Sequence, residues 1–474
     1  MQESLNVDSD PIELVTPKEV AHEIKTNLSP KKAPGFDLIT GEVLKQLPRK
    51  GVVKLTYLFN AAIRLKHVPS IWKIAEVIML PKPGKPPNEV SSYRPISLLP
   101  IISKLFEKLI IKKIIPIIER KNILPDHQFG FRRKHSTIDQ VHRITNIIEK
   151  ALEGKQVCST IFLDVAQAFD KVWHEGLIYK INKILPKQHV ELMKDYVTNR
   201  LFRIKQENEH SDLKEIKAGV PQGSVLGPIL YLLYTCGLSQ PDNTTVATFA
   251  DDTAVLAVGE NMIQSTAKLQ QASNIIVDWT KRWKIKLNEN KSVHINFTNK
   301  NLKNYIPVTI NDSRITYENK AKYLGITLDA KLRWKEHVKK KRKELGIKYR
   351  KLYWLLGRNF QLTIANKIMI YKQILKPVWV YGIQIWGCAK QHHIITIQRF
   401  QNKVLQNIVN APWYCCNKDI HRDLGVEDVA KEIQRVAGKH ETRLHNHANV
   451  EVIQLLDQGG HRRRLKRTKP FELV

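Results

Sequence analysis

Three aspartates lie near the ends of short apolar segments and are the first candidates for chemistry. Asp164 lies near the end of the β-branched run Val157 to Val165, and Asp251 and Asp252 follow the run Thr245 to Ala250. Two carboxylates about 4 Å apart repel by ~4 kcal/mol at an effective dielectric of about 20. Such a cluster therefore requires raised pKa values or divalent cations. Carboxylate oxygens favour Mg²⁺, which also binds water and substrate phosphates.

Divalent ions held by these carboxylates would indicate phosphoryl transfer. One ion lowers the pKa of an attacking hydroxyl and the other stabilises a leaving pyrophosphate, which suits a nucleotidyl transferase. The alternative is an ordinary structural role, in which Asp164 caps a helix and Asp251 and Asp252 are turn residues. Taken singly, each of the three residues favours the structural role, and only the combination with the neighbouring motifs favours a metal site.

The elements around the aspartates are predicted to be strands that alternate with helices. The runs Thr245 to Ala250 and Ala254 to Val258 flank the acidic pair and predict a β-hairpin. Val157 to Val165 predicts a further strand, and helical segments lie between and after these runs. This mixture is typical of an α+β fold in which helices cover one face of a sheet.

A second predicted hairpin is basic. Ala75 to Leu80 is a short apolar strand, and the chain returns as Pro95 to Leu99 after the sharp Pro-Lys-Pro-Gly-Lys-Pro-Pro turn. This hairpin carries Lys82 and Arg94. A helix is predicted after it, because apolar residues recur at helical spacing: Ile102, Leu105, Phe106, Leu109 and Ile110.

The chain is strongly basic, with 77 Lys and Arg against 45 Asp and Glu and a net charge of +32. This excess favours a polyanionic partner over a merely solvated surface, the alternative interpretation. The segment from Val338 to Leu356 predicts an amphipathic helix with the basic run Lys339 to Lys343 on one face. Arg462 to Lys469 contains six basic residues and no acid, and is expected to form a flexible anion-binding tail.

The cysteines indicate neither disulfides nor zinc. The five cysteines include no Cys-x-x-Cys pair. Cys415 and Cys416 with His421 are the candidates for zinc, and adjacent cysteines cannot easily share a tetrahedral site. A secretory signal is not recognisable, and the apolar run Val225 to Leu238 is shorter than the ~20 residues that span a bilayer. We therefore expect a soluble, intracellular protein without membrane contact.

Seven motifs, in order, resemble those of reverse transcriptases. Phe162-Leu163-Asp164-Val165 with Ala168-Phe169-Asp170 resembles motif A, and Phe249-Ala250-Asp251-Asp252 resembles motif C. The other matching segments are Tyr93 to Leu99, Phe129 to Arg132, Gly219 to Pro228 (motif B), Lys286 to Lys291 (motif D) and Tyr323 to Gly325 (motif E).

The variants of motifs B and C are similar to those of non-LTR (LINE-type) retrotransposons. The segment from Val380 to Leu424, with Asn410-Ala411-Pro412-Trp413-Tyr414, resembles the jockey-type elements of insects. The resemblance covers roughly residues 15 to 430. It implies a right-hand polymerase with fingers, a palm built from an antiparallel sheet packed on helices, and a helical thumb.

The implied domains divide the chain into four parts. They are an N-terminal extension (1–61), fingers and palm (62–330), a basic helical thumb (331–400) and a C-terminal segment with a basic tail (401–474).

The resemblance also implies a role for each carboxylate. Asp164 and Asp251 would bind two Mg²⁺ ions, with Mn²⁺ as an alternative metal, and Asp252 would complete the acidic site. Lys291 would protonate the leaving pyrophosphate. A solvated surface lysine is the alternative for Lys291, and Asp170 is interpreted as structural.

Further residues would bind the dNTP substrate. Phe169 matches a steric gate against the ribose 2′-hydroxyl, although a core position fits it too. Gln222 and Gly223 would press against the incoming sugar and base, with a plain turn as the alternative. Lys82 and Arg94 match residues that hold the triphosphate, or else are solvated.

The implied function is RNA-directed DNA polymerisation that copies an element RNA onto a DNA primer by target-primed reverse transcription. The partners would be an RNA template and a DNA primer or target, in the nucleus for integration or in the cytoplasm. We expect this chain to lack its own endonuclease domain. A degenerate copy that only binds RNA and an intron maturase are the competing hypotheses, and the oligomeric state stays open.

Overall fold

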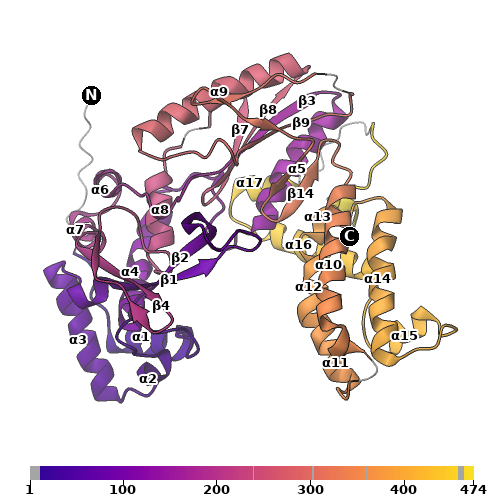
Figure 1. Ribbon diagram of the computed structural model, residues 1–474. Coiled ribbons are helices and arrows are strands. Elements are labelled where there is room, and N and C mark those ends of the chain that lie inside the picture. Colours follow the sequence, from indigo (N-terminus) through magenta and orange to yellow (C-terminus); the bar gives the residue numbers. More distant parts are fainter. Residues whose placement is uncertain (1–10, 239, 302–303, 358–359, 457–463, 474) are drawn as a thin grey trace. The chain divides into compact units, whose positions relative to one another are not determined.

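The structure is a computed structural model that describes residues 11–238, 240–301, 304–357, 360–456 and 464–473 (Figure 1). The chain forms two compact units. The first contains residues up to Pro125, Val165–Ser239 and Ile276–Leu287, and the second contains Asp126–Asp164, Gln240–Ile275 and the chain from Asn288 onward.

The first unit combines helices with a five-stranded sheet. The strand order is β2-β1-β4-β5, with β6 paired to β4. Its strands are β1 (Ile74–Pro81), β2 (Tyr93–Leu98), β4 (Arg200–Gln206), β5 (Glu209–His210) and β6 (Lys214–Ile216). Its helices include α1 (Pro17–His22), α2 (Gly41–Lys45), α3 (Arg49–Leu65), α4 (Ile101–Arg120), α6 (His174–Asn182), α7 (Lys187–Val197) and α8 (Gly227–Thr235).

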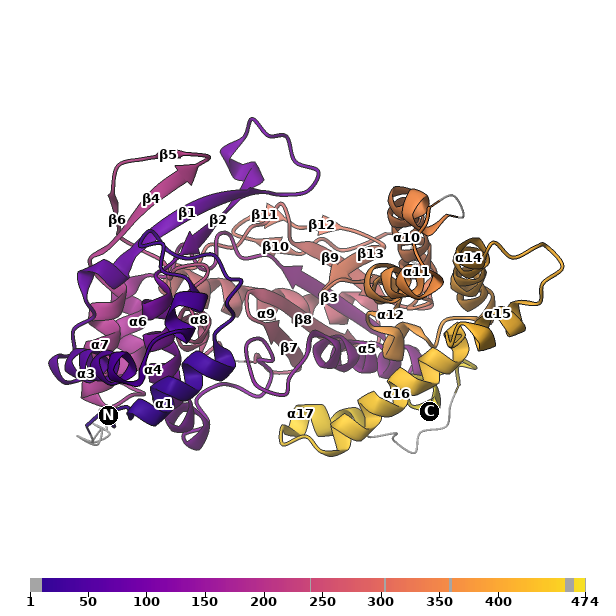
Figure 2. The same ribbon diagram turned by 90° about the horizontal axis from the view of Figure 1, so that it is seen from below.

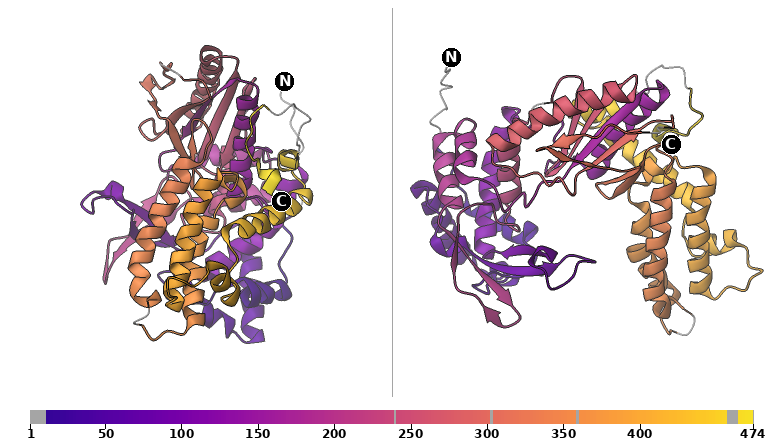
Figure 3. Two further views of the ribbon diagram at one scale, coloured as in Figure 1. Left: turned by 90° about the vertical axis from the view of Figure 1, so that its right-hand side faces the viewer. Right: turned by 45° about the horizontal axis from the view of Figure 1, so that its top comes forward.

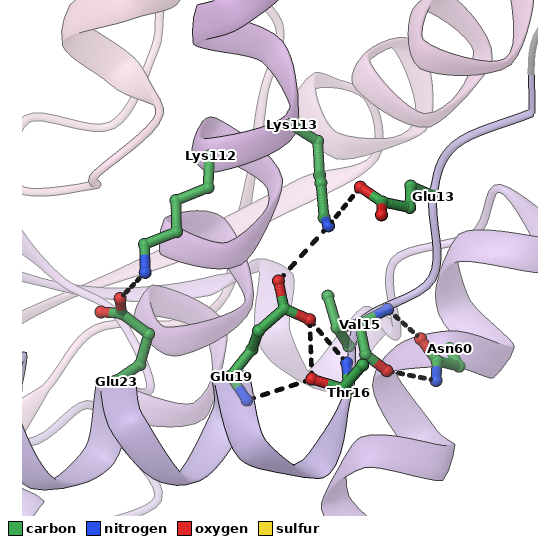
Figure 4. Close-up of polar contacts among 8 residues, drawn as sticks. All are labelled: Glu13, Val15, Thr16, Glu19, Glu23, Asn60, Lys112 and Lys113. Atoms are coloured by element: carbon green, nitrogen blue, oxygen red, sulfur yellow. Dashed lines mark hydrogen bonds and ion pairs between the residues drawn. The ribbon is translucent and has the colours of Figure 1, made fainter.

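The beginning of the described chain is fastened to α3 and α4 (Figure 4). The Asn60 side chain accepts a hydrogen bond from the Val15 N–H and donates one to its carbonyl, both at 2.9 Å. Lys113 pairs with Glu13 at 2.7 Å and with Glu19 at 3.4 Å. The predicted boundary at residue 61 falls inside α3. The first described residues therefore pack together with α3 and α4 as one structure.

The second unit is built on a five-stranded sheet with the order β12-β9-β3-β8-β7. Helix α5 packs against β3 and β7 (Figure 2). The elements are α5 (Thr137–Glu153), β3 (Val157–Leu163), β7 (Thr244–Phe249), β8 (Asp252–Gly259), β9 (Val293–Phe297) and β12 (Thr316–Tyr317), followed by the hairpin β13 (Lys320–Tyr323) and β14 (Ile326–Asp329). Helix α9 (Met262–Arg282) contributes to both units.

Helices continue the second unit after the sheet. Helices α10 and α14 run side by side (Figures 1 and 3), and one hydrophobic core extends from Phe162 on β3 to Trp379 and Trp386 among them. These helices are α10 (Lys335–Leu356), α11 (Ile364–Ile370), α12 (Lys376–Val380), α13 (Ile383–Trp386), α14 (Gln391–Val409), α15 (Asn417–Asp423), α16 (Val429–His445) and α17 (Val450–Ile453).

The basic tail is docked, so the prediction of a flexible tail is wrong for residues 464–469. Arg464 donates hydrogen bonds to the Glu153 and Leu152 carbonyls, and Arg467 donates to the Lys331 carbonyl and the Asn299 side chain. The Arg464 guanidinium thus binds two carbonyls at the C-terminal end of α5, a pairing that the tail sequence alone does not reveal. The predicted start at Arg462 lies outside the described residues.

The predicted strands, the basic hairpin and the amphipathic helices all form, and the α+β class is confirmed. Strand ends differ from the predictions by one to two residues, as is usual where hydrogen-bonded ladders fray. Among the described residues, no helix is both long enough and apolar enough to cross a membrane.

Candidate active site

The sheet of the second unit brings the three aspartates to neighbouring strand ends. Strand β3 pairs antiparallel with β8, with Leu163 opposite Thr253, and Asp164 follows directly. Strands β7 and β8 form the predicted hairpin, in which Phe249 pairs with Asp252 and Asp251 lies in the turn. The carboxyl end of β3 and the start of β8 therefore meet at one end of the sheet.

A buried glutamine holds this acidic turn in place. Ala250 has a left-handed backbone with φ of 57°, which is uncommon for a residue other than glycine. The Gln128 Oε1 atom accepts hydrogen bonds from the Ala250 N–H at 3.0 Å and the Gly130 N–H at 2.8 Å. A Cβ on Gly130 would lie 2.2 Å from the Ala250 nitrogen, so only glycine permits this approach.

A second layer of hydrogen bonds supports Gln128. The backbones of His127 and Phe129 pair with Thr248 on β7. The Gln140 Nε2 atom, on α5, donates to the His127 carbonyl at 3.0 Å and the Thr248 carbonyl at 2.8 Å. Helix α5 thus fixes the segment that holds the turn. Neither glutamine was predicted from the sequence; the only signal was the position of Gln128 directly before the Phe-Gly-Phe motif.

The carboxylates repel one another. The pKa of Asp252 is raised to about 6, mainly by burial and then by the negative charges of Asp251 and Asp164, while Lys322 lowers it. Burial likewise raises the pKa of Asp251, with a smaller contribution from Asp164. A bound cation would relieve this repulsion.

The aspartates can supply one or two carboxylate ligands to a hard divalent cation. In the part of the chain that the structure describes, no three His, Cys, Asp or Glu side chains are arranged to hold one metal ion. Mg²⁺ is usually held by only one or two carboxylates, with water and substrate phosphates filling its octahedron. One or two of these aspartates therefore suffice for each ion.

Lys291 lies beside Asp164, as the motifs suggested. Its Nζ atom is 3.8 Å from the Asp164 carboxylate, and the two side chains are 64% and 40% exposed. The loop that carries Lys291 is tied to the same aspartate, because the Asn288 N–H donates to the Asp164 carbonyl at 2.8 Å. Ser292 accepts the Asp164 N–H at 3.2 Å. At this exposure the ion pair itself adds little stability.

The first unit contains the other predicted residues. The Gln222 Nε2 atom donates to both carboxylate oxygens of Asp170 at 2.9 Å. The Gln222 carbonyl accepts the Ser97 N–H at 2.7 Å. Gly223 has φ of +124°, and a Cβ there would lie 2.5 Å from the Ser97 carbonyl oxygen, so the loop requires glycine. Asp170 thus orients the predicted substrate-contacting amide.

Phe169 packs within this unit. Its ring stacks on Tyr231 with centroids 4.8 Å apart, and its carbonyl accepts the Val220 N–H at 2.8 Å. The ring is only partly buried, so the core and the gate interpretations both stay open.

Lys82 and Arg94 differ in their contacts on the β1–β2 hairpin. The Lys82 Nζ atom donates to the Ser91 carbonyl at 2.7 Å and so helps to close the hairpin. Arg94 is exposed, and its guanidinium has no partner among the described residues. Arg94 is therefore the freer of the two to bind an anion.

Glu107 is a further supporting residue, and it was not predicted from the sequence. It is fully buried on α4, and its Oε2 atom accepts the N–H groups of Val225 at 2.6 Å and Leu226 at 3.0 Å. Burial raises its pKa. These bonds cap the entry to α8 and brace the loop that carries Gln222. The signal was an acid between Phe106 and Leu109 on a helix face that is otherwise apolar.

Known proteins are similar to this chain in sequence. Residues 80–328 match the family described as reverse transcriptase (RNA-dependent DNA polymerase). The chain is 42% identical to the probable RNA-directed DNA polymerase from transposon X-element of Drosophila melanogaster, over 100% of this chain and 52% of that protein. It is 36% identical to the RNA-directed DNA polymerase from mobile element jockey of the same species, over 98% of this chain and 52% of the relative.

The chain thus spans about half the length of the curated relatives it matches. The resemblance to jockey-like non-LTR elements is confirmed. A telomerase structure from Candida albicans is a distant neighbour, at 12% identity and a TM-score of 0.43 over 86% of this chain and 71% of that one.

Proposed function

Since the chain belongs to the reverse transcriptase family, we propose that it extends a DNA primer on an RNA template by nucleotidyl transfer. The observation that carries this proposal is that Asp164, Asp251 and Asp252 lie at neighbouring strand ends. Gln128 holds the turn that carries Asp251 and Asp252. Strain and buried hydrogen bonds concentrated at an acidic turn are typical of functional sites.

Asp164 and Asp251 would hold divalent metal, Mg²⁺ or alternatively Mn²⁺, at two positions, with Asp252 completing the acidic site. When bound, such ions supply charge stabilisation at the attacking and leaving oxygens. Burial and mutual repulsion, which raise the pKa of Asp251 and of Asp252, support a cation here.

The chain's own side chains would bind the dNTP and protonate the leaving pyrophosphate. Lys291, beside Asp164, would donate a proton to the departing pyrophosphate. Arg94, with Lys82, would bind the triphosphate. Gln222, oriented by Asp170, and Gly223 would contact the sugar and base, while Phe169 would exclude a 2′-hydroxyl.

The proposed partners are an element RNA as template and a nicked DNA target as primer, with the nucleus as the site of integration. We propose 1–61 as an N-terminal extension, 62–330 as fingers and palm, 331–400 as thumb and 401–474 as a C-terminal segment. The exposed lysines of α10 support backbone contacts, which are independent of sequence and sensitive to salt.

The test is primer extension on an RNA template with Mg²⁺. The native chain should incorporate dNTPs, and Asp251→Asn should lower the rate by about 100-fold or more, since a metal ligand supplies several kcal/mol of charge stabilisation. Asp278→Asn, an exposed position on α9, is the matched control and should be fully active. No incorporation by the native chain, at low salt with either metal, would favour the RNA-binding alternative.

A further inference from the structure

Four aromatic side chains are exposed at one end of the α10–α14 helix pair. Tyr353 (55% exposed) and Trp354 (61%) lie in the last turn of α10, and Trp413 (93%) and Tyr414 (72%) lie in the loop after α14. Trp413 and Tyr414 are called the aromatic tip. The two helices run in the same direction, because the residues before them, Trp334 and Lys390, line one cavity of about 440 Å³. Their C-terminal ends therefore lie together (Figures 1 and 3).

The loop after α14 holds two of these rings outward. Helix α14 ends at Asn410 in a left-handed conformation, and the Ala411 N–H returns to the Gln406 carbonyl at 3.0 Å. The Cys415 N–H donates to the Pro412 carbonyl at 3.1 Å. Trp413 and Tyr414 occupy the middle of this turn, where their rings contact each other with centroids 5.9 Å apart. Paired exposed aromatics of this kind mark a binding surface.

The chain segment that carries the aromatic tip has charges of one sign. No Asp or Glu occurs from Leu345 to Lys418, and the charged residues within this stretch are all Lys or Arg. Among them, Lys351 and Lys403 are exposed and have no acidic partner in the described part of the chain. Flat apolar rings on a segment whose charges are all positive suit a ligand with stacked bases and phosphates.

A polar groove of about 670 Å³ lies next to the loop and includes Asn402, Asn417 and Lys418. The carbonyl oxygens of the two asparagine side chains already accept hydrogen bonds, from Gln398 and from Gln406. Within the described residues their amide nitrogens donate to no partner, so they are available to base acceptors.

The acidic residues of this groove are already engaged. Asp419 pairs with Arg422 at 3.0 Å, Glu427 pairs with Lys431 at 3.6 Å, and Asp428 caps α16 by accepting the Lys431 N–H at 2.8 Å. Each of these carboxylates thus has a partner in the described part of the chain, whereas Lys418 has none, which favours a nucleotide over a basic peptide.

We propose that the aromatic tip binds unpaired nucleotides of the template, with bases stacked on Trp413 and Tyr414 and phosphates held by the neighbouring lysines. This rests on the proposed function only in taking nucleic acid as the substrate. The ligand is single-stranded nucleic acid, for which template RNA is the natural source.

The test is equilibrium binding of a fluorescein-labelled, unstructured single-stranded RNA, measured by anisotropy without dNTPs. Trp413→Ala with Tyr414→Ala should weaken binding roughly 10-fold or more. Trp413→Phe with Tyr414→Phe should restore it to within about twofold, because phenylalanine keeps a stacking face. Tyr57→Ala with Tyr179→Ala, which removes two other exposed rings, should leave affinity unchanged.

Further ligands separate stacking from charge. The native chain should bind an abasic strand of equal length as weakly as the double alanine variant binds the single-stranded RNA. The native chain and this variant should bind a duplex with equal affinity. A single-stranded DNA of the same sequence tells whether the sugar matters. The assay contains no dNTPs and measures binding alone, so a failure of polymerisation and a failure of this site are distinguishable.

Two results would overturn the proposal. One is equal RNA affinity of the native chain and the alanine variant at matched melting temperature. The other is self-association of the native chain in sedimentation that disappears in the alanine variant while its RNA affinity stays unchanged, which would make the aromatic tip an interface between two copies.

Discussion

At the residue scale, one buried amide determines the geometry of the acidic turn. Gln128 accepts two backbone N–H groups that would otherwise be buried without partners, and one of them belongs to Ala250, next to Asp251. Its contribution to catalysis would be indirect, through the position of the carboxylates. Gln128 is thus a positioning residue in the proposed mechanism.

Gln128→Ala should therefore lower both stability and kcat. Leaving buried donors unsatisfied costs about 1–3 kcal/mol for each group, and displacement of Asp251 should lower kcat at least 10-fold with a smaller change in KM. Melting curves and primer-extension kinetics measure the two effects.

Gln270→Ala is the matched control, because Gln270 on α9 also bonds backbone, accepting the Thr309 N–H at 2.8 Å. This variant should be less stable, with kcat per folded molecule unchanged. An equal decrease of kcat in both variants would contradict the positioning role.

At the element scale, helix α10 separates its two faces by chemistry. Val338, Leu345 and Tyr349 are buried against the core, while Lys339, Lys340 and Lys343 are exposed. Desolvation lowers the pKa of Lys340, and nearby Lys322 and Lys341 lower it further. This concentration of like charge costs stability, and bound phosphate would offset that cost.

Replacing Lys339, Lys340 and Lys343 together by glutamine should weaken template–primer binding and flatten its salt dependence. Removing one phosphate-binding cation lowers the slope of log affinity against log salt by about 0.9. A titration at several salt concentrations measures this slope. The triple replacement Arg49→Gln, Lys50→Gln and Lys54→Gln on α3 removes the same charge from another exposed surface. If both variants had the same slope, net charge rather than α10 would determine binding.

At the scale of the whole molecule, buried histidines should make the fold sensitive to acid. Burial, aided by Lys341 and Lys340, lowers the pKa of His337 to about 3 from its ordinary 6.5. Between pH 3 and pH 6.5, His337 is protonated in the unfolded chain but stays neutral in the folded chain. The free energy of unfolding therefore falls as the pH drops from 6.5, by up to ~1.4 kcal/mol per pH unit.

His337→Asn should reduce this acid sensitivity. The His337 Nδ1 atom accepts the Thr327 N–H at 3.1 Å, and an asparagine oxygen can take its place. Denaturant unfolding of the two proteins at pH 7 and pH 5 measures the effect. Similar stability at pH 7 with a smaller decrease at pH 5 is expected, and parallel decreases would contradict it.

Other buried groups also change how the free energy of unfolding depends on pH, some in the same direction as His337 and one in the opposite direction. Burial also lowers the pKa of His142 to about 3, and those of His127, His294 and His440 to about 4, which adds to the acid sensitivity. Asp252, with its pKa raised to about 6, opposes it, because the folded chain takes up that proton first. Comparing His337→Asn with the native chain isolates one of these contributions.

The local pattern of residues determined the strands and helices of this protein. β-Branched runs predicted β3, β7 and β8, and spacing at three and four predicted α4 and α10, because both periods depend on backbone geometry within a few residues. Motif order then located the aspartates, so the acidic half of the candidate site and the family were accessible from the sequence. Lys291 was also found this way.

Only the tertiary structure decided which distant residues support these positions. Gln128 lies 122 residues before Ala250, and Glu107 lies 118 before Val225. The tail docks against α5 across a separation of 311 residues between Glu153 and Arg464. Such hydrogen bonds join polar groups that have no partner nearby in the sequence and become buried on folding. The sequence shows that these groups need a partner, but it does not show which distant residue provides it. Exposure of Trp413 is equally non-local, because the same ring would suit a core until the fold leaves it uncovered.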